Sequence, residues 1–132
     1  MILAAKNERR RWPRYQAQSG TLLFNERIFA EIINISKGGA FCSYLLAHGE
    51  ESVPIQLINL IDTKRQNSFL EIPCTDLNYQ EPGVNMPLAI LRKSRLKFLP
   101  VNETFDRDLH QFIENIIADR ADSPASDFLT GL

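Results

Sequence analysis

The sequence predicts a mainly β fold, an antiparallel β-barrel followed by one C-terminal helix, and three observations support this prediction. Between residues 21 and 99, short apolar and β-branched runs alternate with turn signals at near-regular spacing. Beyond residue 102 the apolar residues change to a helical period. The chain has 132 residues, 44% hydrophobic and 23% charged, a balance that suits one globular domain with its own core.

The predicted strands come first in the chain. Turn signals separate them at residues 25–27, at Ser36-Lys37-Gly38-Gly39, at the charged stretch 62–67 and at residues 80–83. The two runs that flank the turn at residues 36–39 are expected to pair as a hairpin. In chain order the predicted strands cover residues 21–24, 28–35, 40–46, 53–60, 68–77, 86–92 and 96–99.

The predicted helix covers about residues 103–119. Asn102 or Thr104 can cap its start, and acidic side chains in its first turn suit the positive end of the helix dipole. Residues 120–132 are interpreted as a loose tail that docks on a partner or on the domain. The apolar stripe of the helix consists of Phe105, Leu109, Phe112, Ile113, Ile116 and Ile117.

The segment before the strands is polar and basic. Residues 1–8 are predicted to be a flexible arm, and the domain proper is predicted to cover residues 9–119, with the barrel over about residues 20–100. Pro13 keeps Trp12 out of helical geometry. Residues 6–18 are therefore predicted to form a loop, ordered by itself or by a ligand.

The charge distribution favours a small anionic ligand. Formal net charge is −1, whereas proteins that bind nucleic acid polymers or membrane surfaces in general are far more basic. Residues 6–14 nevertheless carry five basic side chains against one acid, and residues 101–132 carry seven acids against two arginines. A basic segment concentrated on a mildly acidic protein indicates one compact anion, and no nucleic acid polymer is expected as a partner.

Several other classes of protein are disfavoured. Cys42 and Cys74 occur without a C-x-x-C motif or clustered histidines, so we expect no metal site and interpret both as buried apolar side chains. His48 and His110 stand in no recognisable catalytic setting, and neither a G-x-S-x-G motif nor a P-loop is present, so we expect no enzyme and no catalytic residue. No apolar run is long enough to span a bilayer, and the opening apolar residues are too few for a signal sequence. A cytoplasmic location without membrane insertion is predicted.

The first motif that carries chemistry is the run Arg9-Arg10-Arg11-Trp12-Pro13-Arg14. Guanidinium groups are planar, permanently charged and able to donate two parallel hydrogen bonds to a phosphate or to the O6/N7 edge of guanine. Arginines four residues apart on a loop can hold two ends of one nucleotide ligand. Taken by itself, the run also fits a solvated basic arm.

The second motif is Asn34-Ile35-Ser36-Lys37-Gly38-Gly39. Asn34 and Ser36 point to the same face of a strand and offer an amide and a hydroxyl, which can match a guanine edge. Gly38 and Gly39 are expected to permit positive φ and to let a ligand approach the backbone closely. An isolated motif of this kind also fits an ordinary hairpin turn.

Together the two motifs resemble the signature of the PilZ family, R-x-x-x-R followed by [D/N]-x-S-x-x-G. Arg10 and Arg14 match the first part, and Asn34, Ser36 and Gly39 match the second. The resemblance extends over about residues 9–118 and implies a six-stranded antiparallel barrel with a C-terminal α-helix. It further implies a receptor for the bacterial second messenger cyclic di-GMP, with no separate cofactor.

The resemblance also implies roles for the matching residues. Arg10 and Arg14 would bind phosphates and guanine Hoogsteen edges, Asn34 and Ser36 would bind a guanine and nearby polar atoms, and Gly39 would leave room for the ligand.

Further candidates follow from positions beside the two motifs. In this family an arginine directly before the first motif often accompanies binding of a stacked, intercalated pair of ligands, so Arg9 either contacts a second cyclic di-GMP or is solvated. Arg11 and Gly38 are secondary candidates for ligand binding. Trp12 is interpreted as a hydrophobic anchor of the loop, with a base-covering role as the alternative.

The last strand departs from the family pattern. Many members carry a glycine before an x-R-F triplet, whereas this chain reads Ser94-Arg95-Leu96-Lys97-Phe98. The basic side chains of residues 92–97 are interpreted as protection of an exposed strand against edge pairing, with an electrostatic contact to ligand as the alternative.

The function that the resemblance implies is that of an adaptor. Cyclic di-GMP would order the arginine loop on the barrel and so create a surface for an effector protein, which the sequence does not identify. The alternative is a PilZ-like protein-interaction module that does not bind nucleotide.

Overall fold

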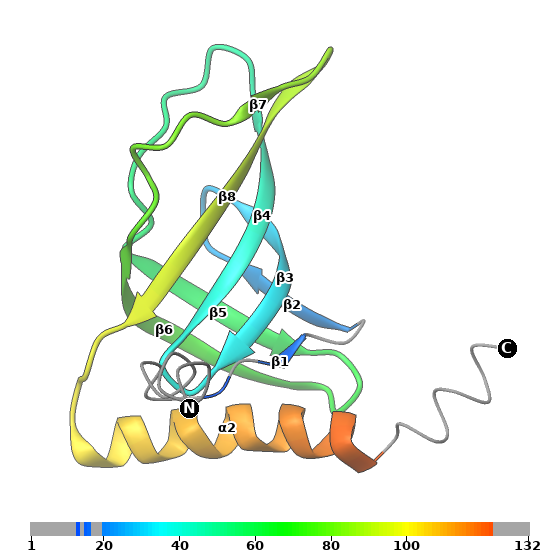
Figure 1. Ribbon diagram of the computed structural model, residues 1–132. Helices are drawn as coiled ribbons and strands as arrows, with labels where there is room; N and C mark the ends of the chain where they lie inside the picture. Colours follow the sequence, from blue (N-terminus) through cyan, green and yellow to red (C-terminus); the bar gives the residue numbers. More distant parts are fainter. Residues whose placement is uncertain (1–12, 14, 17–19, 123–132) are drawn as a thin grey trace, which may run out of the picture.

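The structure is a computed structural model, and the residues that it describes are 13, 15, 16 and 20–122. Within these residues, six strands form the barrel, two strands of two residues each are added to it, and one long helix follows (Figure 1). The barrel strands are β2 (Thr21–Phe24), β3 (Phe29–Ser36), β4 (Gly39–Ala47), β5 (Leu57–Asp62), β6 (Asn67–Asp76) and β8 (Ala89–Phe98). The short strands are β1 (Tyr15–Gln16) and β7 (Val84–Asn85), and the helix is α2 (Glu103–Asp122).

The barrel is closed and entirely antiparallel. Its neighbours run in the order β3-β2-β5-β6-β8-β4, and a β3–β4 pairing joins the two ends of this series. Strand β1 pairs with β3 and β7 pairs with β8. The predicted six-stranded barrel with a C-terminal helix is confirmed, as is the hairpin around residues 36–39.

The core forms from alternate residues of each strand. In β4, for example, Ala40, Cys42 and Tyr44 are buried, and the residues between them are at least partly exposed. Cys42 and Cys74 both lie in the core, as expected. Burial raises the pKa of each thiol from 9.0 to about 12. Both cysteines therefore act as small apolar side chains.

Helix α2 closes one end of the barrel, below the strands in the view of Figure 1. Its predicted apolar stripe packs on the core, and the Phe69 and Phe105 rings meet edge to face with centroids 5.1 Å apart. Asn102 is the cap, because its Oδ1 accepts from the Phe105 N–H at 2.8 Å. The helix runs beyond the predicted end at residue 119. Among the described helices, none is long and apolar enough to span a membrane.

Strand β3 contains a bulge that reverses its side-chain alternation. Ile32 lies opposite Cys42, but the next register pair is Asn34 with Phe41, so Ile33 is an extra residue in the ladder. Before the bulge Ile32 faces the core, and after it Ile35 does so. In a regular strand Asn34, two residues after Ile32, would be in phase with Ile32 and would face the core. The bulge therefore turns Asn34 and Ser36 to the outside of the barrel.

Strand β8 differs from its prediction. Residues 86–92 and 96–99 were expected to form two strands, but Ala89–Phe98 forms one strand that pairs with β4 along its whole length. Its other side pairs with β6, with β7 and, through Arg95, with residues 77 and 78. The interpretation of its basic residues as edge protection is therefore wrong. Arg92, one of that set, is buried and donates to the carbonyl of Tyr79.

Strand β5 also begins later than expected. The predicted strand covered residues 53–60, whereas β5 spans Leu57–Asp62. The preceding residues are tied down without a regular ladder: the Ile55 N–H donates to the Asp76 carboxylate at 3.1 Å, and the Gln56 carbonyl accepts from the Cys74 N–H at 3.0 Å. A buried apolar residue such as Ile55 produces the sequence signal of a strand even where the backbone is irregular.

Candidate ligand-binding site

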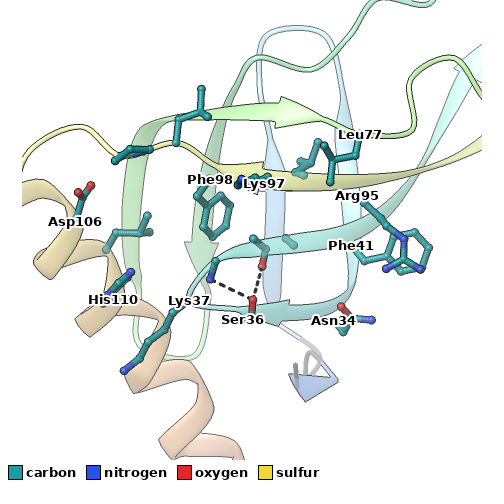
Figure 2. Close-up of a pocket in the computed structure, with 17 residues that line it drawn as sticks. Asn34, Ser36, Lys37, Phe41, Leu77, Arg95, Lys97, Phe98, Asp106 and His110 are labelled. Carbon is teal, nitrogen blue, oxygen red and sulfur yellow. Dashed lines mark hydrogen bonds between the residues drawn. The ribbon is translucent and has the colours of Figure 1, made fainter. Parts of the chain in front are cut away.

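A pocket of about 730 Å³ lies where the β3–β4 hairpin, β8 and the first turns of α2 meet (Figure 2). This volume lies within the range of small-molecule sites. Every residue of the second motif except the buried Ile35 lines it, namely Asn34, Ser36, Lys37, Gly38 and Gly39. The structure thus brings the predicted polar corner of the barrel into a concave site.

Two rows of residues cross the strands at this pocket. In the first row Asn34 lies opposite Phe41, and Phe41 lies opposite Arg95. Residues opposite one another in an antiparallel pair have Cβ atoms about 4.5–5.5 Å apart. The row therefore places an amide, an aromatic ring and a guanidinium side by side, and Figure 2 shows these three side chains at one end of the pocket.

The second row runs one step closer to the helix. Ser36 lies opposite Gly39, and Gly39 lies opposite Lys97. Gly39 contributes no side chain between the serine and the lysine. In Figure 2, Ser36 and Lys37 lie on the helix side of the pocket, towards His110.

Ser36 helps to build the turn as well as to line the pocket. Its Oγ accepts from the Gly38 N–H at 3.1 Å and donates to the Gly39 carbonyl at 3.5 Å, as the dashed lines of Figure 2 show. The Gly38 carbonyl in turn accepts from the Phe98 N–H at 2.9 Å, which ties the turn to β8. A serine hydroxyl has two acceptor lone pairs, so one remains for a ligand.

Gly39 is required by the approach of another strand. A Cβ added there would lie 2.1 Å from the carbonyl oxygen of Leu96 in β8. Neither Gly38 nor Gly39 uses the positive φ that glycine permits; among the described glycines, positive φ occurs at Gly20 and Gly49. The close packing of β4 on β8 accounts for the glycine without any ligand.

The electrostatics of the pocket favour an anion. Lys37, Arg95 and Lys97 line it against one carboxylate, that of Asp106. The Asp106 carboxylate already accepts from the Val101 N–H at 3.0 Å, and Lys37 pairs with Glu114 at 3.7 Å. The Arg95 guanidinium carbon lies 4.7 Å from the centroid of the Phe41 ring. A ligand carrying phosphates suits this set of charges.

The predicted arginines, Arg9, Arg10, Arg11 and Arg14, lie outside the described residues, as does Trp12. Tyr15, which follows Arg14 in the chain, is described and pairs with Ile35, and Gln16 pairs with Asn34. The described part of the chain therefore begins beside the strand segment that carries Asn34 and Ser36.

Sequence reasoning missed Phe41 as a pocket residue and gave Arg95 and Lys97 a different primary role. All three are outward positions of strands, a pattern that fits any solvated barrel face. Their meeting with Asn34 depends on the register between strands that are far apart in the chain, for which the sequence contains no local signal.

Comparisons with known proteins bear on the fold. No protein-family model and no curated protein matches the sequence. Among solved structures, the chain is similar to the cyclic di-GMP (c-di-GMP) complex of YcgR from Escherichia coli, at 17% identity and a TM-score of 0.57. That match covers 89% of this chain and 50% of the other, so this chain spans about half the length of that protein.

In two further matches, the alignment covers nearly the whole of the solved chain. The PilZ domain of Escherichia coli YcgR with c-di-GMP matches at 17% identity and a TM-score of 0.59, over 90% of this chain and 98% of the other. An uncharacterised Legionella protein matches at 13% identity and a TM-score of 0.51, over 83% and 98%. The structure is a closed six-stranded antiparallel barrel with a helix across one end, and it aligns with the PilZ domain of YcgR over 90% of this chain. The fold is therefore PilZ-like.

Proposed function

We propose that this chain is a receptor for cyclic di-GMP. The observation that supports this most directly is the placement of Asn34 and Ser36 in a basic pocket, on the strand that pairs with the residues next to Arg14. The likeness of the fold to PilZ structures that hold c-di-GMP supports the same ligand. The proposed role is binding, with no catalytic residue assigned.

The chemistry of the pocket suits each part of that ligand. Two phosphates match the two lysines that line the pocket, Lys37 and Lys97. The amide of Asn34 offers both donors and an acceptor to a guanine edge, and Ser36 retains one acceptor lone pair. Gly39 lines the pocket beside these groups, although the approach of β8 by itself explains the glycine.

The arginines of the first motif are proposed to complete the site. Arg14 directly precedes Tyr15, which pairs with Ile35. The Cα atoms of these two consecutive residues are therefore about 3.8 Å apart. Arg10 lies four residues earlier, a stretch that reaches at most roughly 13–14 Å when fully extended. The two guanidinium groups can therefore bind different parts of one dinucleotide. Arg9 is the proposed contact to a second, stacked ligand, and Arg11 is a secondary candidate for ligand binding.

Signalling is proposed to follow from ordering of the N-terminal segment. Charge-assisted hydrogen bonds and stacking with the ligand offset the conformational entropy that the segment loses. The segment and the bound ligand would then present a combined surface to an effector protein.

Isothermal titration of the full chain with cyclic di-GMP tests this proposal. Arg10→Ala and Arg14→Ala should each lower the affinity at least tenfold, about 1.4 kcal/mol, because each removes a charge-assisted contact. Arg27→Ala is the matched control: it removes an exposed arginine from the β2–β3 turn, outside this pocket, and should leave the affinity unchanged. Unchanged binding in both motif variants would contradict the assignment.

A thermal melt separates this function from the alternative. A ligand that binds the native state raises the melting temperature, and the rise grows with the logarithm of the ligand concentration once that concentration exceeds Kd. An unchanged melting temperature at ligand concentrations far above micromolar would favour a protein-interaction module that does not bind nucleotide.

A further inference from the structure

We propose that Arg95, supported from below by Phe41, is a stacking platform for one guanine base of the ligand. This inference rests on the proposed function and adds to it a residue that lies outside both motifs. The site it defines is planar and cationic, and the chemical class it accepts is a purine base attached to a phosphate.

The geometry places Arg95 where a base would meet it. Arg95 and Phe41 lie opposite one another on β8 and β4, and Asn34 lies on the far side of Phe41 in the same row. Asn34, Phe41 and Arg95 all line the pocket, and Figure 2 shows the Arg95 side chain over the Phe41 ring. A guanine whose edge is bound by Asn34 would lie beside this row, within reach of Arg95.

The guanidinium is held in position before any ligand arrives. Its carbon lies 4.7 Å from the Phe41 ring centroid, a cation–π distance. The backbone of Arg95 is fixed on the side away from β4: its N–H donates to Asn78 Oδ1 at 3.0 Å, and its carbonyl accepts from the Leu77 N–H at 2.8 Å. A side chain that is already ordered loses less entropy when a ligand binds.

The guanidinium carbon lies over the ring, and Arg95 is exposed to solvent. Guanidinium planes stack on nucleobases as aromatic rings do. Within residues 20–122, no carboxylate forms an ion pair with Arg95. Protection of a sheet edge does not explain the residue either, since β8 is bonded on both sides at this point. A base stacked on the guanidinium is the partner that we infer for this residue.

The test is titration of cyclic di-GMP into the full chain and three variants. Arg95→Ala should weaken binding roughly 5- to 100-fold, the range expected for the loss of one stacked base. Arg95→Lys keeps the positive charge but removes the planar guanidinium group. This variant should bind cyclic di-GMP nearly as weakly as Arg95→Ala does. Lys93→Ala is the control, because Lys93 is exposed on the same face of β8, carries the same charge and lies outside the pocket. It should change the affinity less than twofold.

Phe41→Leu tests the support under the guanidinium. It should weaken binding in the unaltered chain and add less than twofold in the Arg95→Ala background, because the ring acts through the arginine. If Phe41→Leu lowers the affinity equally with and without Arg95, the ring itself is the stacking platform and the proposal is overturned. A thermal melt of each variant confirms that it is folded.

The remaining outcomes separate this inference from the proposed function. If the affinity of Arg95→Ala for cyclic di-GMP is within twofold of that of the unaltered chain while Arg14→Ala binds weakly, the stacking role of Arg95 is wrong and the receptor function stands. If Arg95→Lys binds like the unaltered chain, the contact is one of charge alone and stacking is wrong. If the unaltered chain does not bind cyclic di-GMP, both proposals are overturned.

Discussion

At the scale of single residues, the Asn34–Gly39 segment is both a turn and a binding surface. Ser36 holds the turn with its hydroxyl, Gly38 bonds to β8 through its carbonyl, and Asn34 is left outward and partly exposed. Most of the motif is thus explained by the backbone of the hairpin. Only Asn34, which has no turn hydrogen bond among the described residues, is left with its amide directed to the pocket.

Gly39→Ala should reduce the free energy of unfolding by about 1–3 kcal/mol, because the new methyl group would overlap the Leu96 carbonyl and push β4 away from β8. Urea denaturation measures the loss. Ser43→Ala, at an outward position of the same strand, is the control and should stay within about 0.5 kcal/mol of the unaltered chain. A variant at Gly39 with full stability and reduced ligand affinity would show that the glycine makes room for ligand instead.

At the scale of elements, small irregularities position the site. The bulge at Ile33 reverses the alternation of β3, and the continuous β8 carries Arg95 and Lys97 past the hairpin. Helix α2 begins beside the pocket, with Asp106 and His110 on its wall. The capping of α2 therefore bears on the site as well as on the helix.

Asn102→Ala should lower the stability of the chain by about 1 kcal/mol, because the Phe105 N–H loses its acceptor at the first turn of α2. Chemical denaturation followed by circular dichroism gives the value. Thr104→Ala, two residues along and exposed, removes the other side chain considered as a cap and should change stability by less than about 0.5 kcal/mol. The reverse order of the two effects would assign the cap to Thr104.

At the scale of the whole molecule, barrel and helix form one body. A closed barrel has no free edge along its strands but two open ends, and α2 covers one of them with its apolar stripe (Figure 1). The pocket lies at the border between this helix and the barrel wall, so its shape depends on both.

Ile113→Ala should cost about 2–5 kcal/mol, because Ile113 is completely buried where the helix meets the barrel and its loss leaves a cavity. Thermal and urea unfolding provide the measurement. Gln111→Ala, on the exposed side of the same helix, should change stability by less than about 0.5 kcal/mol. Equal, small effects of both changes would mean that the helix is not docked on the barrel in solution.

The sequence by itself determined the mainly β class, the approximate position of most strands, the helix with its apolar stripe and the polar turn at residues 34–39. These features follow from local patterns, namely a period of two, a helical period and turn residues, which a single chain displays directly. The merging of two predicted strands into β8 was less accessible, because inward-facing Arg92 and Ser94 interrupt the apolar pattern of a buried strand.

Only the tertiary structure decided which side chains surround Asn34. One extra residue in β3 reverses the face of every residue that follows it, and the apolar pattern of the strand does not show which residue is the extra one. Phe41 and Arg95 meet Asn34 through pairings between β3, β4 and β8, and β8 lies some 50 residues further along the chain. Such pairings depend on how the whole barrel closes, because each register is set jointly by the packing of all six strands.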